Sequence, residues 1–339
     1  MKTLLKFIIA LLTTVFFTKC NHSQLDIDTS KIDMKPVVIN RLDKDVFALN
    51  ASNIGQQTTP LLNKYGAFYN RYVSTLGING AHDSLYPQKL IAFTSDKDMS
   101  EAYADIQKTY SENDVELLSE ELTEAVKRFK VFFPSRKIPS KFVAFMGGFN
   151  YNIVYVDSTL GVGLEMYLGQ QSKFYNMMRL PNYRTVNMNK ENILPDMIRG
   201  WLITEFDNGA TETKLINHLI FYGKLFYACD ALLPKVADSL KIGYNTKQLD
   251  YCHKFESNLW GFFAKDNKLF ENDMKIVSEF TNDGPFSGSI SKECPPRIAM
   301  WVGWQLVKSY MKNNPKVTVD ELMNEKDAQK ILSKSKYKP

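Results

Sequence analysis

The fold is decided between residues 142 and 168, where the sequence reads FVAFMGGFNYNIVYVDSTLGVGLEMYL. Three runs in this stretch are rich in β-branched and aromatic residues, namely 142–146, 153–156 and 161–168. Gly147-Gly148 and Asp157-Ser158 separate the runs, and short links of this kind are typical of turns between neighbouring strands. The spacing therefore predicts an antiparallel meander of at least three strands.

The third run alternates between apolar residues and residues that tolerate a polar surface. The apolar positions are Val162, Leu164 and Met166, and the positions between them are Gly163, Glu165 and Tyr167. Because successive side chains of a strand point to opposite faces, this pattern predicts one buried face and one face that can be polar.

The rest of the chain is mostly helical in its spacing of apolar residues. A short strand is expected at 37–39, followed by a turn. Helices are expected at 60–76 (with Pro60 in the first turn), 113–133, 215–233, 249–263 and 298–311. The last of these is apolar nearly all round, which is typical of a central, buried helix. The sequence therefore predicts an α+β fold, with a small antiparallel sheet and a helical majority, as one globular domain over 37–339.

The net charge excludes one class of partner. Of 42 basic residues, Lys2, Lys6 and Lys19 precede Cys20, and 39 remain against 37 acidic residues, a net charge of +2. A nucleic-acid-binding protein needs a concentrated basic face, which this balance does not favour.

The N-terminus has the pattern of a lipoprotein export signal. A positive start is followed by an uncharged, mostly apolar run from Phe7 to Phe17, which is too short to cross a bilayer core of about 30 Å. Cys20 follows, with the polar residues 21–24 after it. We therefore expect residues 1–19 to be a cleaved signal peptide, Cys20 to be lipidated, and residues 20–36 to be a tether. An ordinary cleaved signal with an incidental cysteine is the alternative.

Export makes a disulfide possible among the three other cysteines. Cys229, Cys252 and Cys294 form an odd set with no CxxC pair. Three buried free thiols are the other interpretation, and spacing does not select a pair.

No catalytic motif is complete. The closest approach to the helical zinc motif HExxH runs from His218 to Tyr222, with tyrosine in place of the second ligand. Ser287-Gly288-Ser289 lacks the full GxSxG pattern and is interpreted as a loop. Glu165 and Asp157 are single carboxylates, for which a solvated or capping role is expected. The sequence therefore predicts no metal, no cofactor and no enzymatic site.

One cluster suggests a surface for a partner protein. Arg297, Trp301 and Trp304 lie at or on the expected helix 298–311, and arginine and tryptophan are enriched at binding hot spots. The alternative is a buried core helix with Arg297 near its first turn, which the all-round apolarity favours.

Several short motifs resemble the GldB family, the gliding-motility lipoproteins of the Bacteroidetes. They are Met166-Tyr167-Leu168-Gly169, Ala231-Leu232-Leu233-Pro234, Ile242-Gly243-Tyr244 with Gln248-Leu249, Pro285-Phe286-Ser287, Arg297-Ile298 with the run from Val302 to Met311, and the terminal run from Lys334 to Pro339. They occur in order over essentially the whole mature chain.

This resemblance implies an envelope lipoprotein associated with gliding and held to a membrane by its lipid. Asn21 stands where a retention aspartate would, and no dense acidic pair follows Cys20 directly, which favours the periplasmic face of a membrane over the cell surface. The resemblance also implies contacts with proteins of the gliding or secretion machinery. The family layout also resembles a zinc-peptidase scaffold, but the ligand histidines are missing here and Tyr222 stands where a glutamate is usual, so a metal-free scaffold is expected. An exported hydrolase and a periplasmic module that binds peptide or glycan are the alternative functions.

Overall fold

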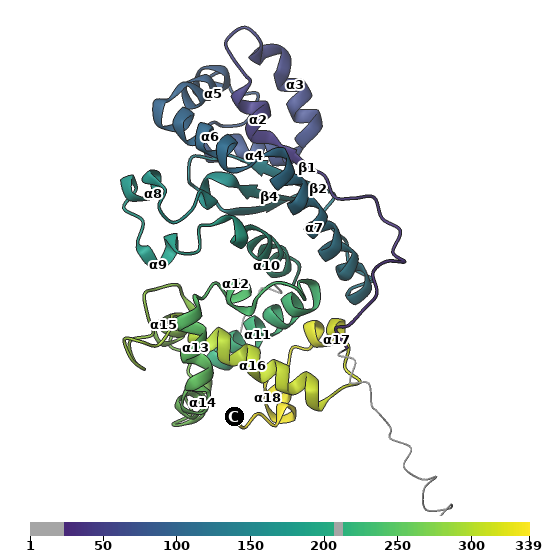
Figure 1. Cartoon of the computed structure of the whole chain (residues 1–339), viewed down its shortest axis with the longest axis vertical. Coiled ribbons are helices and arrows are strands. Elements are labelled where there is room, and N and C mark those ends of the chain that lie inside the picture. The colour runs from purple at the N-terminus through teal and green to yellow at the C-terminus, as the bar shows by residue number, and fades with distance from the viewer. Residues whose placement is uncertain (1–23, 207–212) are drawn as a thin grey trace, which may run out of the picture.

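The computed structural model describes residues 24–206 and 213–339, and it confirms an α+β fold with a helical majority (Figure 1). The sheet has four strands in the order β1-β2-β4-β3. They are β1 (Ile39–Arg41), β2 (Lys141–Phe145), β3 (Ile153–Val156) and β4 (Thr159–Gly163).

The antiparallel meander is wrong, because the sheet is mixed. β1 pairs with β2 in parallel, and β2 pairs with β4 in parallel, with Phe142 opposite Leu160. Only β3 and β4 form an antiparallel pair, joined by a tight turn at Asp157 and Ser158, both with positive φ. The strand that follows β2 in the sequence is not its neighbour in the sheet. The chain first forms β3 at the edge of the sheet, and β4 then lies between β2 and β3.

The third run is also shorter as a strand than its composition indicates. β4 ends at Gly163, and Leu164–Tyr167 form a turn of 3-10 helix, η1. Neither face is polar, because every residue from Thr159 to Tyr167 is buried. The reason is that helices cover both faces of the sheet, so the expected polar face does not exist.

The first face is covered by a compact group of N-terminal helices. They are α2 (Leu42–Phe47), α3 (Ile54–Tyr65), α4 (Ala67–Thr75) and α5 (Tyr86–Ser95), with α6 (Lys97–Thr109) beside them. Phe68 of α4 packs so closely on the sheet that a β-carbon at Gly161 would lie 2.5 Å from its ring. The strand expected at 37–39 lies two residues later in the sequence, as β1, and α2 follows it directly. Pro60 lies inside α3, not in the first turn, because α3 begins at Ile54.

The second face packs on α7 (Glu112–Phe132) and α10 (Ile193–Phe206). The helix expected at 113–133 is confirmed as α7, which begins with a capping box between Ser111 and Asp114. Between η1 and α10 the chain makes α8 (Lys173–Met177), α9 (Asn182–Thr185) and the 3-10 turn η2 (Lys190–Asn192).

The C-terminal half is built on a pair of crossing helices, α11 (Leu215–Leu232) and α16 (Ile298–Asn313), which confirm two expected helices. Around them lie α12 (Asp238–Ile242), α13 (Thr246–Lys254), α14 (Glu256–Ala264), η3 (Lys268–Phe270), α15 (Met274–Thr281), α17 (Val319–Asn324) and α18 (Ala328–Ser335). The single helix expected at 249–263 is wrong, because Phe255 interrupts it between α13 and α14. One cluster of buried side chains runs from Val37 to Ile331 and joins the sheet to these helices.

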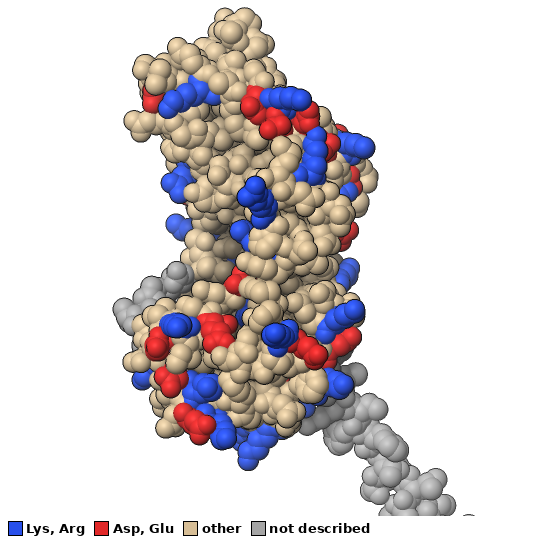
Figure 2. All heavy atoms as spheres, turned by 90° about the vertical axis from the view of Figure 1, so that its left-hand side faces the viewer, with Lys and Arg blue, Asp and Glu red and all other residues tan. Residues whose placement is uncertain are grey.

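No helix in the two described ranges has the length and apolar character needed to cross a membrane. The surface charges are mixed. Figure 2 shows acidic and basic side chains interspersed over one face of the molecule.

Candidate functional site

Cys20, the expected lipidation site, lies outside the described residues, as does the expected signal peptide. The other expected site residues, Arg297, Trp301 and Trp304, are described. Both tryptophans are fully buried in α16. Trp301 packs edge-on against His253, and Trp304 packs against Phe226 of α11. Their burial favours the interpretation of α16 as a core helix, since a partner protein cannot reach side chains inside the core.

Arg297 is placed differently, at the rim of a small polar cavity. It precedes α16 with φ of 57°, a conformation that non-glycine residues rarely adopt. Its Nε lies 3.2 Å from Asp283, and its Nη2 donates to the Gly243 carbonyl at 3.2 Å. The cavity measures about 290 Å³, and its lining includes Asn187 and Gln248. Arg297 therefore joins three separate segments of the chain around this cavity.

Trp304 belongs to a polar cluster around Asp230 of α11, to which α12 and α16 also contribute side chains. Its Nε1 donates to Asp230 Oδ2 at 2.8 Å, and Lys241 Nζ lies 2.7 Å from Asp230 Oδ1. Lys308 lies 3.7 Å from the same carboxylate and stacks on the Trp304 ring. Asp230 is thus held by two cations and an indole. This cluster fixes helices to one another.

Glu165, for which a solvated or capping role was expected, is fully buried in η1. Its Oε1 accepts from the backbone N–H groups of Gly147 at 2.6 Å and Phe149 at 3.2 Å, while Oε2 is buried without a hydrogen-bond partner. Burial raises its pKa to about 7, and the backbone hydrogen bonds offset part of that rise. Glu165 therefore holds the turn after β2 at its junction with β4, and a solvated role is wrong.

Nucleophilic and metal-binding groups are not assembled in the described part of the chain. Ser287 is buried, with its hydroxyl donating to the Pro295 carbonyl at 2.8 Å. Cys229, Cys252 and Cys294 are buried free thiols whose pKa values burial raises. Within residues 24–206 and 213–339, no three potential ligand side chains gather as a metal site would require.

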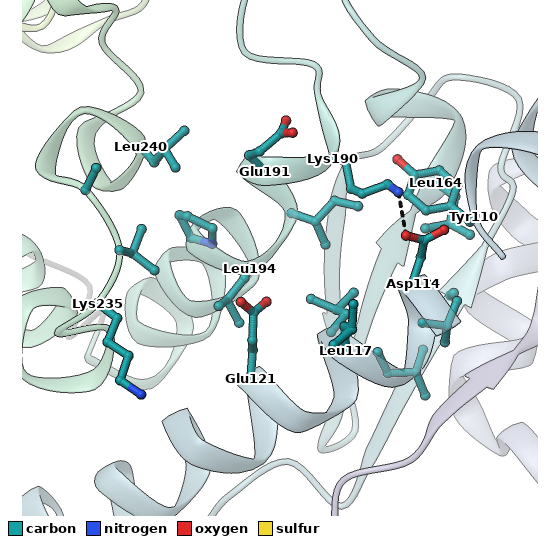
Figure 3. A pocket seen from close by; sticks show the side chains of 18 residues that line it. Tyr110, Asp114, Leu117, Glu121, Leu164, Lys190, Glu191, Leu194, Lys235 and Leu240 are labelled. Atoms are coloured by element: carbon teal, nitrogen blue, oxygen red, sulfur yellow. Dashed lines mark hydrogen bonds and ion pairs between the residues drawn. The ribbon is translucent and has the colours of Figure 1, made fainter. Parts of the chain in front are cut away.

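An apolar groove lies beside the sheet, and Figure 3 shows the side chains that line it. We call it the α7 groove. The first half of α7 forms one wall, the start of α10 with η2 forms the other, and the segment Lys235–Leu240 closes one end. Its volume is about 500 Å³, enough for several side chains of a ligand. Its floor comes from Ile39 of β1, Ala144 of β2 and Leu164.

Charged side chains line this groove. Lys190 Nζ lies 2.7 Å from Asp114 Oδ1 at one end, next to the Tyr110 ring. Glu121 extends from α7 toward Leu194, and Lys235 stands at the opposite end (Figure 3). Partial burial raises the pKa of Glu121. The groove therefore offers an apolar channel with charges of both signs beside it.

Local sequence patterns do not reveal this groove, because its two walls, residues 114–121 and 190–195, lie at least 69 residues apart in the chain. The local signal was Leu117, an exposed leucine between Glu116 and Glu120 on α7. A large apolar side chain is 51% exposed there, at the edge of a groove that already contains Val115 and Leu118. An exposed apolar residue that continues an apolar groove is typical of an interaction site.

The fold and the groove define the class: a helix-dominated α+β protein with a small mixed sheet and an apolar surface groove. A family model described as gliding motility protein GldB matches residues 22–339, nearly the whole chain. The chain therefore belongs to the GldB family, which is linked to gliding motility. No curated protein and no solved structure matches it significantly.

Proposed function

We propose that this chain is a lipid-anchored protein of the cell envelope, facing the periplasm, that takes part in gliding by binding another protein and not by catalysis. The family match and the lipoprotein pattern around Cys20 support the location and the process. Two or more acyl chains on one cysteine give a stable anchor, whereas one chain does not.

The α7 groove is the observation that supports a protein-binding role. An amphipathic helix of a partner would place its apolar side chains against Leu117, Leu118 and Leu194, as in other helix-in-groove complexes. A basic residue on that helix would face Glu121, and an acidic residue would face Lys235. We therefore expect the partner to be an envelope protein of the gliding or secretion machinery with such a helix.

The test compares two exposed leucines that differ in their position. Leu117 lines the groove and is 51% exposed, whereas Leu85 at the start of α5 is 50% exposed and outside the groove. In cells that lack the native gene, Leu117→Asp is expected to abolish spreading while the protein level in membranes stays normal. Leu85→Asp is expected to restore spreading fully. Normal spreading with Leu117→Asp would contradict the proposal.

A photo-crosslinking amino acid at the same two positions tests the contact directly. At 117 we expect one motility or secretion component to be captured in defined amounts, and this product should disappear when Glu121→Lys is added. At 85 no such product is expected. Equal products at both positions would show that the groove is not the contact site.

The absence of catalysis is a separate part of the proposal. Purified protein is expected to contain no stoichiometric zinc and to show no peptidase activity that a chelator removes. Bound zinc at one equivalent, or chelator-sensitive cleavage, would instead support the exported hydrolase.

The polar cavity at Arg297 favours the second alternative, a module that binds a glycan or peptide. Its lining includes the amide side chains of Gln170, Asn182 and Gln248, which suit neutral polar groups. A saturable rise in melting temperature with envelope glycans, lost in Arg297→Ala, would support that function.

A further inference from the structure

The first described residues are not a free tether. Gln24 Nε2 donates to the hydroxyl of Tyr227 on α11 at 2.8 Å, and Arg128 Nη2 on α7 donates to the Leu25 carbonyl at 2.6 Å. Thr29 Oγ1 donates to Glu124 of α7 at 2.8 Å. The tether expected over residues 20–36 is therefore attached to the body from Gln24 onward.

Burial along this segment supports the same conclusion. Leu25 and Ile27 are half-buried, with Leu25 packed against the core, whereas Gln24, Asp26 and Asp28 are exposed. Arg128 is itself buried, and its Nε donates to the Ala231 carbonyl at 2.5 Å. One side chain thus holds α7, α11 and the N-terminal segment together.

The remaining free length is short. Three residues lie between Cys20 and Gln24, and the four Cα–Cα steps that join them span at most about 14 Å in a fully extended chain. If Cys20 carries the lipid, as the proposed function requires, Gln24 stays within that distance of the bilayer surface. The body cannot then move far from the membrane, because Gln24 is fixed to α11.

The helix that holds Gln24, α11, also contacts α17 and the link that follows it. Lys224, one turn before Tyr227 on α11, donates to the carbonyls of Met323 at 3.2 Å and Glu325 at 2.8 Å. Arg136, just after α7, donates to Asn324 at 2.8 Å. In Figure 1 the described N-terminal segment begins in the lower half of the view, where α17 is drawn, and runs past α7 to β1, whereas α2–α6 lie at the top.

We infer that the side formed by α17, the link to Lys326 and the C-terminal half of α7 lies against the phospholipid surface. The sequence around α17 carries charges of both signs (Lys316, Asp320, Glu321 and Lys326), so the lipid anchor and the short chain between Cys20 and Gln24 set the orientation. The helices α2–α6 then project away from the membrane. The bilayer therefore covers this side of the protein, and the α7 groove remains accessible to a protein partner.

The orientation can be measured by energy transfer in vesicles. Full-length acylated protein is bound to phosphatidylethanolamine and phosphatidylglycerol vesicles that contain an acceptor-labelled lipid. A donor dye is attached to Lys326→Cys or, on the loop before α3 at the distal end, to Ala51→Cys; both positions are exposed and the native thiols other than Cys20 are buried. We expect strong quenching at 326 and weak quenching at 51, at both low and high salt.

A lengthened chain provides the control. Twenty Gly/Ser residues inserted between Ser23 and Gln24 should leave vesicle binding unchanged and reduce quenching at 326 to the level at 51. Equal quenching at both positions in the uninserted protein, while it floats with the vesicles, would overturn the orientation alone. Failure to float would overturn the lipid anchor and, with it, this inference.

Discussion

Gly223 of α11 and Gly303 of α16 face each other where the two helices cross. A β-carbon on Gly223 would lie 2.3 Å from the Gly303 carbonyl oxygen, and one on Gly303 would lie 1.9 Å from the carbonyl oxygen of Leu219. Real β-carbons do not approach backbone oxygens so closely. The helices at the centre of the C-terminal half can therefore pack at this distance only because both positions are glycine.

The first prediction follows from this contact. Gly303→Ala must push α16 away from α11, so the free energy of unfolding is expected to fall by about 3 kcal/mol or more, the upper end for overpacked cores. Urea unfolding followed by circular dichroism measures the change. In Gly261→Ala, on the exposed side of α14 with nothing within 4 Å, we expect a gain of about 0.5–1 kcal/mol. Equal changes in the free energy of unfolding for the two substitutions would contradict the close contact of α11 and α16 at Gly303.

The helices were more predictable from the sequence than the sheet, for a physical reason. The apolar spacing that identifies α7, α11 and α16 is local to each helix. Strand pairing depends on where the chain goes after each strand, and nothing local in residues 142–163 shows that β2 pairs with β4 in parallel. The burial of Glu165 depends on helices from two distant segments, so alternation within one strand could not predict it.

A second prediction concerns the buried cluster around Asp230. Asp230→Ala leaves Lys241 and the Trp304 indole without their common acceptor in the core, although Asp238 remains 3.1 Å from Lys241. Removing one partner of a buried ion pair costs about 3–5 kcal/mol, and we expect about 3 kcal/mol here because Asp238 remains. Chemical denaturation measures the loss.

The matched control for that cluster is an exposed ion pair. Glu101 pairs with Lys173, and both side chains are more than 40% exposed. Because water screens an exposed ion pair, Glu101→Ala is expected to leave the free energy of unfolding almost unchanged. A loss for Asp230→Ala as small as that for Glu101→Ala would show that the cluster adds little to stability.

A third prediction is a pH dependence that Glu165 causes. Its pKa is raised from 4.5 to about 7 in the folded protein, so between these pH values the folded state keeps a proton that the unfolded state has lost. This contribution to stability is fully present below pH 4.5 and is lost as the pH rises through 7. The size of the pKa shift limits this contribution to the free energy of unfolding to about 3 kcal/mol.

Glu165→Gln tests the direction of this pH dependence. Glutamine keeps an oxygen that accepts from Gly147 and Phe149 but does not ionise, so the variant should gain stability relative to the native protein between pH 5 and pH 8. Melting temperatures across that range measure the difference. Glu165→Ala, which leaves two buried N–H groups unpaired, should destabilise at every pH. A difference between Glu165→Gln and the native protein that does not change with pH would rule out the raised pKa.

The candidate site was harder to predict than the fold. Arg297 and the two tryptophans are close in sequence, but they point to different places: Arg297 borders a polar cavity, and Trp301 and Trp304 fill the core. Helical spacing alone cannot say which side of an all-apolar helix meets solvent. The α7 groove needs α7, η2 and the segment after α11 in one place, and only tertiary packing brings these segments together.

The last prediction concerns the three cysteines, for which the sequence left a disulfide or free thiols open. In the structure all three are free and buried, and burial raises the pKa values of Cys229 and Cys294 to about 12. A thiol must lose its proton and be reached by the reagent to react. Native protein that lacks Cys20 should therefore take up essentially no maleimide at pH 7, whereas protein unfolded in guanidinium without reductant should take up three equivalents by intact mass. One equivalent in the unfolded sample would instead reveal a disulfide formed during export, and labelling of the native protein would show that the core around α11 and α16 opens.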